Sequence, residues 1–231
     1  QSPVESLAGF TFGVFLLHFI INKDYKRAIF ALIIVVLASK RIVYVGVLIS
    51  IFVYVLHGRR QYNKKVLMLA GLIINTIIVF ILYGLAQGSY DIIISEVTGL
   101  PANQLLTGRL FVYRDVVNIV GNPSLIGEGL GFTSTIIQGG FTRTNINLMH
   151  SDVLKLIIEI GIVGSAIYAL ILYYIGSKGS YILSMIVFYN ILCLTDNVTI
   201  YFEVLFTIFL LIYYNYVNNR SNFNNRFQPS I

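Results

Sequence analysis

The chain has 231 residues, of which 57% are hydrophobic and 11% are charged, and it carries a net charge of +6. Soluble domains average about 45–50% apolar and about 25% charged residues, and a soluble fold of this size could not bury so much apolar surface. The composition therefore excludes an ordinary soluble protein. The basic residues are spread between apolar runs, which excludes nucleic acid as the partner and indicates membrane topology instead.

Seven apolar runs predict an all-α, polytopic membrane helix bundle with about seven transmembrane helices. A helix needs about 20 mostly apolar residues to cross a bilayer, within a range of about 17–25. The runs meet or approach that length, and they cover residues 7–21, 28–38, 42–56, 66–85, 153–175, 181–194 and 198–216.

We expect one functional domain in four consecutive parts. Residues 1–85 form N-terminal transmembrane helices, 86–151 a large polar loop containing short helices, 152–216 C-terminal transmembrane helices, and 217–231 a tail. The sequence begins with Gln1, and residues 1–6 lack the basic segment of a signal peptide. We therefore expect further helices to precede it.

The second and third runs are separated by Ser39-Lys40-Arg41. A single span over residues 28–56 would bring Lys40 and Arg41 near the middle of the bilayer, where each charge costs roughly 2.5–3.5 kcal/mol. It would also place the basic link 57–65 outside. We therefore predict two short helices that meet at residues 39–41.

The distribution of Lys and Arg predicts the orientation. Ten of the sixteen basic residues fall on the side that holds residues 22–27, 57–65, 176–180 and the tail, where Asp24 is the only acidic residue. Basic residues concentrate in cytoplasmic loops. The loop 86–151 is therefore predicted to be extracytoplasmic, together with residues 39–41 and 196–197.

Within the loop, Thr107 is suited to be the N-cap of a helix that continues to Val120. Asn122-Pro123 ends this helix, and three alternate glycines from Gly127 to Gly131 then form a flexible turn. A dinucleotide site is excluded at this turn because no strand precedes it. The apolar residues of the helix recur at spacings that place them on one face. They are Val112, Tyr113, Val116, Val117 and Val120.

The predicted outer side gathers the groups that could carry chemistry. Arginine side chains suit phosphate oxygens, and Arg109 would lie in the first turn of the loop helix, where an anionic ligand is favoured. Anchoring at the membrane interface or a loop salt bridge is the alternative interpretation of each arginine. The candidates are Lys40, Arg41, Arg109, Arg114, Asp115, Arg143, His150, Asp152 and Glu159.

His150 directly precedes the fifth run and can serve as a general base, with a structural role as the alternative. Glu159 lies within that run, where a carboxylate is costly unless it faces protein or water, and Lys155 is a candidate partner one turn earlier. The single cysteine, Cys193, has no second Cys or His at metal-ligand spacing. We therefore predict neither a metal site nor a cofactor.

Several short motifs occur in a fixed order along the chain. They are Ser2-Pro3 to Leu7-Ala8, Ser39-Lys40-Arg41, Thr107-Gly108-Arg109, Asn122-Pro123, Gly127-Glu128-Gly129-Leu130-Gly131-Phe132, His150, and Glu159-Ile160-Gly161-Ile162-Val163-Gly164. In this order and spacing, residues 1–175 resemble the O-antigen ligase and polysaccharide polymerase family.

The resemblance implies a metal-independent glycosyltransferase in the cytoplasmic (inner) membrane, with its active face extracytoplasmic. It implies that a glycan passes from an undecaprenyl diphosphate carrier to an acceptor, with the lipid bilayer, a flippase and a chain-length regulator as further partners. Arg41 and Arg109 would contact the carrier diphosphate, and His150 would act at the acceptor. Weaker candidates for substrate binding are Arg114, Arg143, Tyr113, Lys40 and Glu159.

The resemblance favours polymerisation of lipid-linked oligosaccharide repeat units into O-antigen, capsular or exopolysaccharide. Three alternatives stay open: ligase-type transfer of polymer to lipid or protein, transport of a polysaccharide precursor, and a non-catalytic scaffold. A transporter would place ionisable groups at the bilayer midplane. Apart from Lys155, Glu159 and Glu203, the apolar runs are nearly uncharged, which is evidence against a transporter.

Overall fold

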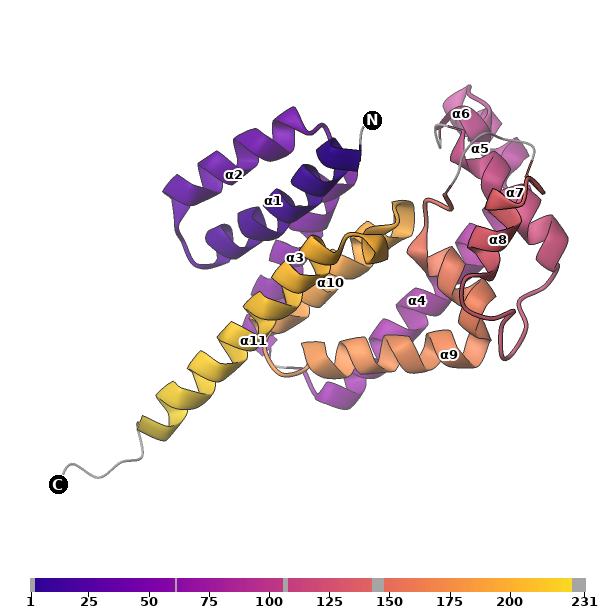
Figure 1. The fold of residues 1–231 in the computed structure, drawn as a ribbon. Helices are drawn as coiled ribbons and strands as arrows, with labels where there is room; N and C mark the ends of the chain where they lie inside the picture. Colours follow the sequence, from indigo (N-terminus) through magenta and orange to yellow (C-terminus); the bar gives the residue numbers. More distant parts are fainter. Residues whose placement is uncertain (1–2, 61, 106–107, 143–147, 226–231) are drawn as a thin grey trace. The chain divides into compact units, whose positions relative to one another are not determined.

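The computed structural model describes residues 3–60, 62–105, 108–142 and 148–225, in which every regular element is a helix (Figure 1). This confirms the all-α prediction for the described residues. Three helices are long and apolar enough to cross a membrane, and shorter apolar helices cover Leu7–Ile21, Ser180–Thr195 and Phe202–Asn218. The three are α3 (Arg41–Arg60), α4 (Lys64–Ala86) and α9 (Asp152–Gly176). The count of seven spans stays a prediction.

The chain divides into two compact units. The first comprises Gln1–Met68, Leu172–Leu192 and Val198–Ile231, and the second comprises Leu69–Ile171 and Cys193–Asn197. The predicted boundaries at residues 85 and 151 stay predictions; the loop between them packs with parts of α4 and α9 in the second unit.

In the first unit, α1 (Pro3–Ile21) and α2 (Tyr25–Leu37) run side by side as a helical hairpin (Figure 1). Asp24 is the N-cap of α2, and its carboxylate accepts a hydrogen bond from the backbone N–H of Arg27. The unit continues through α3, the end of α9 and most of α10 (Ser180–Thr195), and it closes with η1 (Val198–Ile200) and α11 (Phe202–Asn225).

The predicted break between residues 28–38 and 42–56 is confirmed, because α2 ends at Leu37 and α3 begins at Arg41. Ser39 lies in the left-handed region with φ 51°, a conformation that interrupts a right-handed helix. The Lys40 side chain is buried, and its Nζ lies 5.3 Å from the centre of the Phe10 ring. Folding the ammonium back over an aromatic face stabilises a charge that a straight helix would carry into the bilayer.

The long helices expose large apolar side chains. In α4, four apolar side chains are about half exposed or more: Leu69, Ile73, Ile77 and Phe80. Several apolar side chains of α2 are exposed to a similar extent. Such surfaces are unfavourable in water and favourable against lipid chains, where the backbone polar groups must be satisfied inside each helix. The exposed faces therefore agree with the interpretation of these helices as membrane segments.

The second unit contains most of α4, then α5 (Asp91–Thr98), α6 (Ala102–Leu105), α7 (Arg109–Val120), α8 (Phe132–Gln138) and the first part of α9. Helix α7 confirms the predicted loop helix, with Gly108 at its N-cap; Thr107 lies outside the described residues. Four of the five predicted apolar positions are buried, Val120 is partly buried, and Leu110 joins them in the core. The predicted face therefore packs on the side chains of α4, α8 and α9.

Helix α9 is interrupted at Gly161, where φ is 71° and ψ is −174°. The segment before α8 fills the break: the N–H of Glu128 donates to the carbonyl of Ile158 at 2.9 Å, and the N–H of Ile162 donates to the carbonyl of Ser124 at 3.1 Å. The alternate-glycine turn, predicted to be flexible, is thus fixed to α9 by backbone hydrogen bonds. These bonds satisfy peptide groups that the interrupted helix leaves without a helical partner.

The last predicted run, residues 198–216, does not form one continuous helix. It opens with the short η1, and α11 starts only at Phe202 and extends to Asn225. The first part of the predicted polar tail is therefore helical, because Asn residues near a helix end do not by themselves terminate it.

Candidate active site

Arg109 is the first residue of α7, and its Nη1 donates a hydrogen bond to the carbonyl oxygen of Thr195, the last residue of α10. The last carbonyls of a helix lack intrahelical donors and carry partial negative charge. A guanidinium has five N–H donors, so this bond orients Arg109 and uses one of them. The side chain is half-buried and stays suited to binding an anion such as a phosphate.

Tyr113 lies one turn after Arg109 on the same face of α7. Its hydroxyl donates a hydrogen bond to the backbone carbonyl of His150. Burial raises the pKa of the Tyr113 phenol above its ordinary value; the Arg109 charge opposes this rise, and Asp196 and Asp152 add to it. The phenol is therefore protonated at neutral pH and serves as a donor that fixes the backbone at His150.

His150 pairs with Asp196, which is 46 residues away in the sequence. The Nδ1 atom of His150 lies 3.4 Å from Oδ1 of Asp196, and the two side chains are 28% and 7% exposed. The same carboxylate oxygen accepts the backbone N–H of Asn197 at 2.9 Å. A buried carboxylate beside a partly accessible imidazole is the arrangement that orients a general base.

These contacts join three helix ends within the second unit. The start of α7 contributes Arg109, the turn before α9 contributes His150, and the segment after α10 contributes Asp196. The N–H of Asp152 also donates to the carbonyl of Asp196 at 3.4 Å. We call Arg109, Tyr113, His150 and Asp196 the imidazole cluster.

Glu159, predicted to bind substrate, is buried in the second unit away from the start of α9. Its Oε1 accepts hydrogen bonds from the backbone N–H of Thr133, at 3.3 Å, and from the Thr133 hydroxyl. Thr133 is the second residue of α8, so the carboxylate satisfies donors at the start of that helix. The observed partner of Glu159 is thus Thr133, and substrate binding by Glu159 stays a prediction.

Arg114 forms an ion pair with Asp91 of α5, with its Nη2 atom 2.5 Å from both carboxylate oxygens. The pair ties α7 to the start of α5. Arg143 lies outside the described residues. Lys40 and Arg41 belong to the first unit, where Lys40 packs on Phe10 and Arg41 is exposed at the start of α3. Contact of these arginines with a substrate stays a prediction.

Sequence reasoning did not include Asp196 among the candidates. A signal was present, because Asp196-Asn197 is a polar interruption between two apolar runs on the same predicted side as His150. The pairing itself spans 46 residues and depends on where α9 begins and where α10 ends. Within the residues that the structure describes, no group of three or more His, Cys, Asp or Glu side chains could hold a metal ion.

A protein-family model described as O-antigen ligase matches residues 28–169, more than half of the chain. The chain belongs to the O-antigen ligase family. The matched residues include Arg109, His150 and Glu159, whereas Asp196 lies beyond the matched range. Comparison with curated proteins and with solved structures gives no match.

Membership in the O-antigen ligase family points to a membrane protein of polysaccharide biosynthesis, with ligase- or polymerase-type, glycosyltransferase-like activity on a lipid-linked substrate. This agrees with helices that are long and apolar enough to cross a membrane.

Proposed function

We propose that this protein polymerises lipid-linked oligosaccharide repeat units into O-antigen, capsular or exopolysaccharide, by glycosyl transfer from an undecaprenyl diphosphate carrier. The reaction takes place on the extracytoplasmic face of the cytoplasmic membrane. The observation that carries the proposal is the imidazole cluster, which combines an oriented imidazole with a guanidinium in a member of the O-antigen ligase family.

In this reaction His150 is the general base. With Nδ1–H donating to the Asp196 carboxylate, Nε2 carries the lone pair that accepts a proton from the acceptor hydroxyl. The hydroxyl oxygen forms a bond to the anomeric carbon of the donor sugar, and the bond from that carbon to the diphosphate oxygen breaks. The Asp196 carboxylate stabilises the imidazolium that forms.

Undecaprenyl diphosphate leaves with the electron pair of the broken bond. Charge develops on its terminal phosphate oxygens, and cationic groups that are already in place stabilise that charge. Arg109 supplies one such group, held in position by its bond to Thr195. Arg41 is the second proposed cation, and Arg114 and Arg143 are further candidates. A diphosphate is a good leaving group, so positioning and charge stabilisation are the main demands on the protein.

The test is an analysis of lipid-linked sugars in a deletion strain that carries either the wild-type chain or Arg109→Ala. We expect the variant to insert normally and to lose polymer by at least about 100-fold, because a preorganised donor to developing charge contributes about that factor. Arg27→Ala is the matched control, since Arg27 lies at an exposed turn, where it pairs with Asp24 and lies over the Phe19 ring. Normal polymer in Arg109→Ala would contradict the proposed site.

The lipid that accumulates distinguishes a polymerase from a ligase. Single repeat units on the carrier indicate a polymerase, as proposed. Long polymer that stays on the carrier indicates ligase-type transfer to another lipid or a protein, and it would overturn polymerisation while leaving glycosyl transfer intact. A flippase and a chain-length regulator are proposed partners, expected to be encoded near the polymerase gene.

A further inference from the structure

The segment between α7 and α8 carries large apolar side chains that nothing in the second unit covers. We call residues 124–131 the glycine segment. Within it, Leu125 is 65% exposed, Ile126 is 84% exposed and Leu130 is 82% exposed. Apolar side chains that are exposed together are unfavourable in water and mark a surface for a protein or a membrane.

The backbone of the glycine segment is fixed, so these side chains cannot turn inward by a local rearrangement. Four backbone hydrogen bonds of 2.9 to 3.1 Å join the segment to α9 on both sides of Gly161. A fifth bond lies within the segment, where the N–H of Gly127 donates to Oγ of Ser124 at 2.7 Å. These bonds satisfy backbone polar groups of the segment, which is what an apolar environment requires.

The segment is bound to α9 at some distance from the start of that helix. Its bond to the carbonyl of Ile158 lies six residues after Asp152, a rise of about 9 Å. Helix α9 is long and apolar enough to cross a membrane. An element that lies in the membrane interface buries its apolar side chains about 5–10 Å into the boundary between head groups and acyl chains. The point of attachment agrees with that depth.

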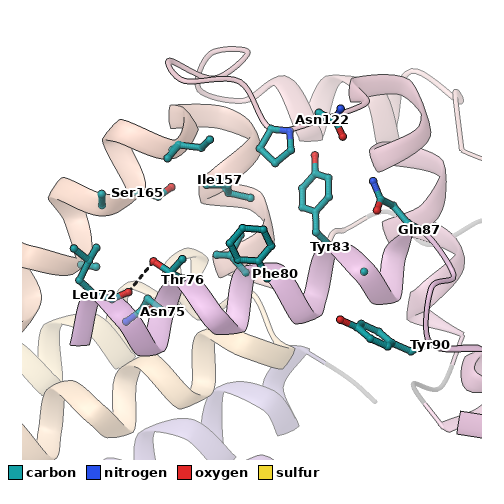
Figure 2. A pocket seen from close by; sticks show the side chains of 16 residues that line it. Leu72, Asn75, Thr76, Phe80, Tyr83, Gln87, Tyr90, Asn122, Ile157 and Ser165 are labelled. Carbon is teal, nitrogen blue, oxygen red and sulfur yellow. Dashed lines mark hydrogen bonds between the residues drawn. The ribbon is translucent and has the colours of Figure 1, made fainter. Parts of the chain in front are cut away.

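The residues just before the segment are attached near the end of α4, a second helix of membrane length. The hydroxyl of Tyr83, three residues before the end of α4, donates to the carbonyl of Gly121 at 3.0 Å. Asn122 and Pro123 line a cavity of about 430 Å³ between α4 and α9, together with Tyr83 and Phe80 (Figure 2). The chain therefore enters the glycine segment beside two helices of membrane length.

The exposed side chains continue the exposed apolar face of α9. Val163, whose N–H donates to the carbonyl of Leu125, is itself 52% exposed. Ile167 and Ile171 follow it at intervals of four residues, which places them on the same face, and they are 52% and 54% exposed. Lipid chains cover such a face along its whole length. This continuity favours the bilayer over a protein partner as the occupant of the surface.

The one charged side chain of the segment limits how deeply it inserts. Glu128 is exposed, and its carboxylate acts electrostatically on Tyr83 near the end of α4. A carboxylate is costly among acyl chains and is tolerated among head groups. The interface, where apolar side chains and a carboxylate are both accommodated, fits this composition.

We infer that the glycine segment inserts Leu125, Ile126 and Leu130 into the interface of the lipid bilayer. A stretch that reads as part of a polar loop is thereby a membrane-contacting element, and it fixes the interruption of α9 at the membrane surface. The inference does not depend on the proposed function, because it concerns contact with lipid and not the reaction.

The test uses tryptophan fluorescence, since the chain contains no tryptophan of its own. Ile126→Trp and Leu130→Trp each introduce one fluorophore, and the second serves should the first fail to fold. Phe80→Trp, at a 71% exposed position of α4, is the reference for lipid contact. Asn118→Trp, at an exposed polar position of α7, is the matched control in the same unit.

Each purified variant is reconstituted into vesicles of phosphatidylethanolamine, phosphatidylglycerol and phosphatidylcholine, the last either unmodified or brominated on its acyl chains. Bromine quenches tryptophan on contact, and acrylamide in the buffer quenches tryptophan that is exposed to water. We expect brominated lipid to reduce the emission of Ile126→Trp and Leu130→Trp nearly as much as that of Phe80→Trp. Asn118→Trp should be quenched mainly by acrylamide.

Two results would overturn the inference. Quenching of both segment variants by acrylamide, with no effect of brominated lipid, would place the segment in water. Protection from both quenchers would show that protein covers the segment, which in a purified preparation means a second copy of this chain. Polymer formation is a separate readout, so neither result would bear on the proposed function.

Discussion

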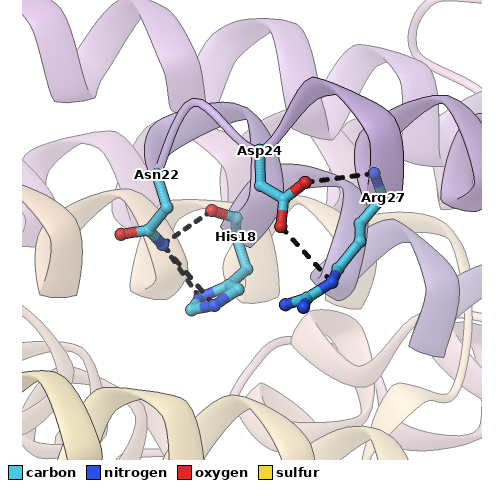
Figure 3. Close-up of polar contacts among 4 residues, drawn as sticks. All are labelled: His18, Asn22, Asp24 and Arg27. Atoms are coloured by element: carbon cyan, nitrogen blue, oxygen red, sulfur yellow. Dashed lines mark hydrogen bonds and ion pairs between the residues drawn. The ribbon is translucent and has the colours of Figure 1, made fainter.

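Two histidines at helix ends, one in each unit, show what separates a local turn from a candidate active site. Around His18, one hydrogen bond joins distant segments, between Nδ1 of His18 and the Tyr181 hydroxyl at 2.7 Å. Most other contacts connect near neighbours: Asn22 Nδ2 donates to the carbonyl of His18 at 2.8 Å, and Arg27 Nε lies 3.3 Å from Asp24 (Figure 3). Around His150, the contacts connect residues 37 and 46 positions apart. The first set closes the turn between α1 and α2.

The contacts of His150 in the imidazole cluster join distant segments, which must be brought together before these contacts form. Its carboxylate is also nearly buried, at 7% exposure of the Asp196 side chain, compared with 35% for Asp24. Electrostatic interactions are stronger where water is excluded. The comparison teaches that Asp196 is the less exposed carboxylate and lies 3.4 Å from the imidazole of His150, whereas Asp24 lies 3.3 Å from the guanidinium of Arg27.

The largest expected effect comes from breaking the His150–Asp196 pair. Asp196→Asn removes the charge that stabilises the imidazolium, and we expect the rate of polymer formation to fall by about 10²–10⁴-fold. We expect a loss of the same size in His150→Ala, which removes the general base itself. The rate is measured with a purified lipid-linked repeat unit. Asp24→Asn is the control in the other unit and should polymerise like the wild type. A fully active Asp196→Asn enzyme would remove the pair from the mechanism.

The next effect concerns the interrupted helix. At Gly161, an added Cβ would lie 2.5 Å from the carbonyl carbon of Ile126, and the positive φ alone costs a non-glycine residue about 1–3 kcal/mol. We expect Gly161→Ala to reduce the yield of folded protein severely. Gly164, three residues later, has no positive φ, and the atoms nearest to the Cβ added by Gly164→Ala belong to the Ile160 side chain, at 2.9 Å and beyond, so a smaller loss is expected there. Similar yields of the two variants would show that the break at Gly161 is not required.

A smaller loss of stability is expected at Glu159. Glu159→Ala leaves the Thr133 hydroxyl and N–H buried without an acceptor, at a cost of about 1–3 kcal/mol. The thermal midpoint in detergent should fall, and adding Thr133→Val should lower it little further, because both changes remove one interaction. Glu203→Ala, at an exposed position, is the control. Loss of polymer without loss of stability would instead support the predicted role in substrate binding.

The smallest expected effects are the stability changes on removing the arginine of each Arg–Asp pair, Arg27–Asp24 and Arg114–Asp91. Arg27 is 72% exposed and Arg114 is 27% exposed. Exposed ion pairs contribute about 0–1 kcal/mol, so Arg27→Ala should be indistinguishable from the wild type and Arg114→Ala only slightly less stable. A polymer loss in Arg114→Ala far beyond this stability change, restored by Arg114→Lys, would show contact with the carrier.

Much of the helix pattern could be predicted because its causes are local. The apolar face of α7 follows from residue spacing, and the break at residues 39–41 follows from two charges in an apolar run. The interruption of α9 could not be predicted in this way. Gly161 lies in an apolar run that reads as one helix, and the reason for the break is a separate segment, residues 124–129, that bonds to it.

The sequence by itself determined that the described part of this protein is all-helical, that it carries membrane-length apolar segments, and that residues 28–169, which include Arg109 and His150, match the O-antigen ligase family. Hydrophobicity and helix periodicity act over a few residues, so they can be followed along the chain. Only the tertiary structure decided that Asp196 contacts His150, that Glu159 accepts hydrogen bonds from Thr133 at the start of α8, and that a cavity lies between α4 and α9. These features depend on packing between distant segments, which no local pattern specifies.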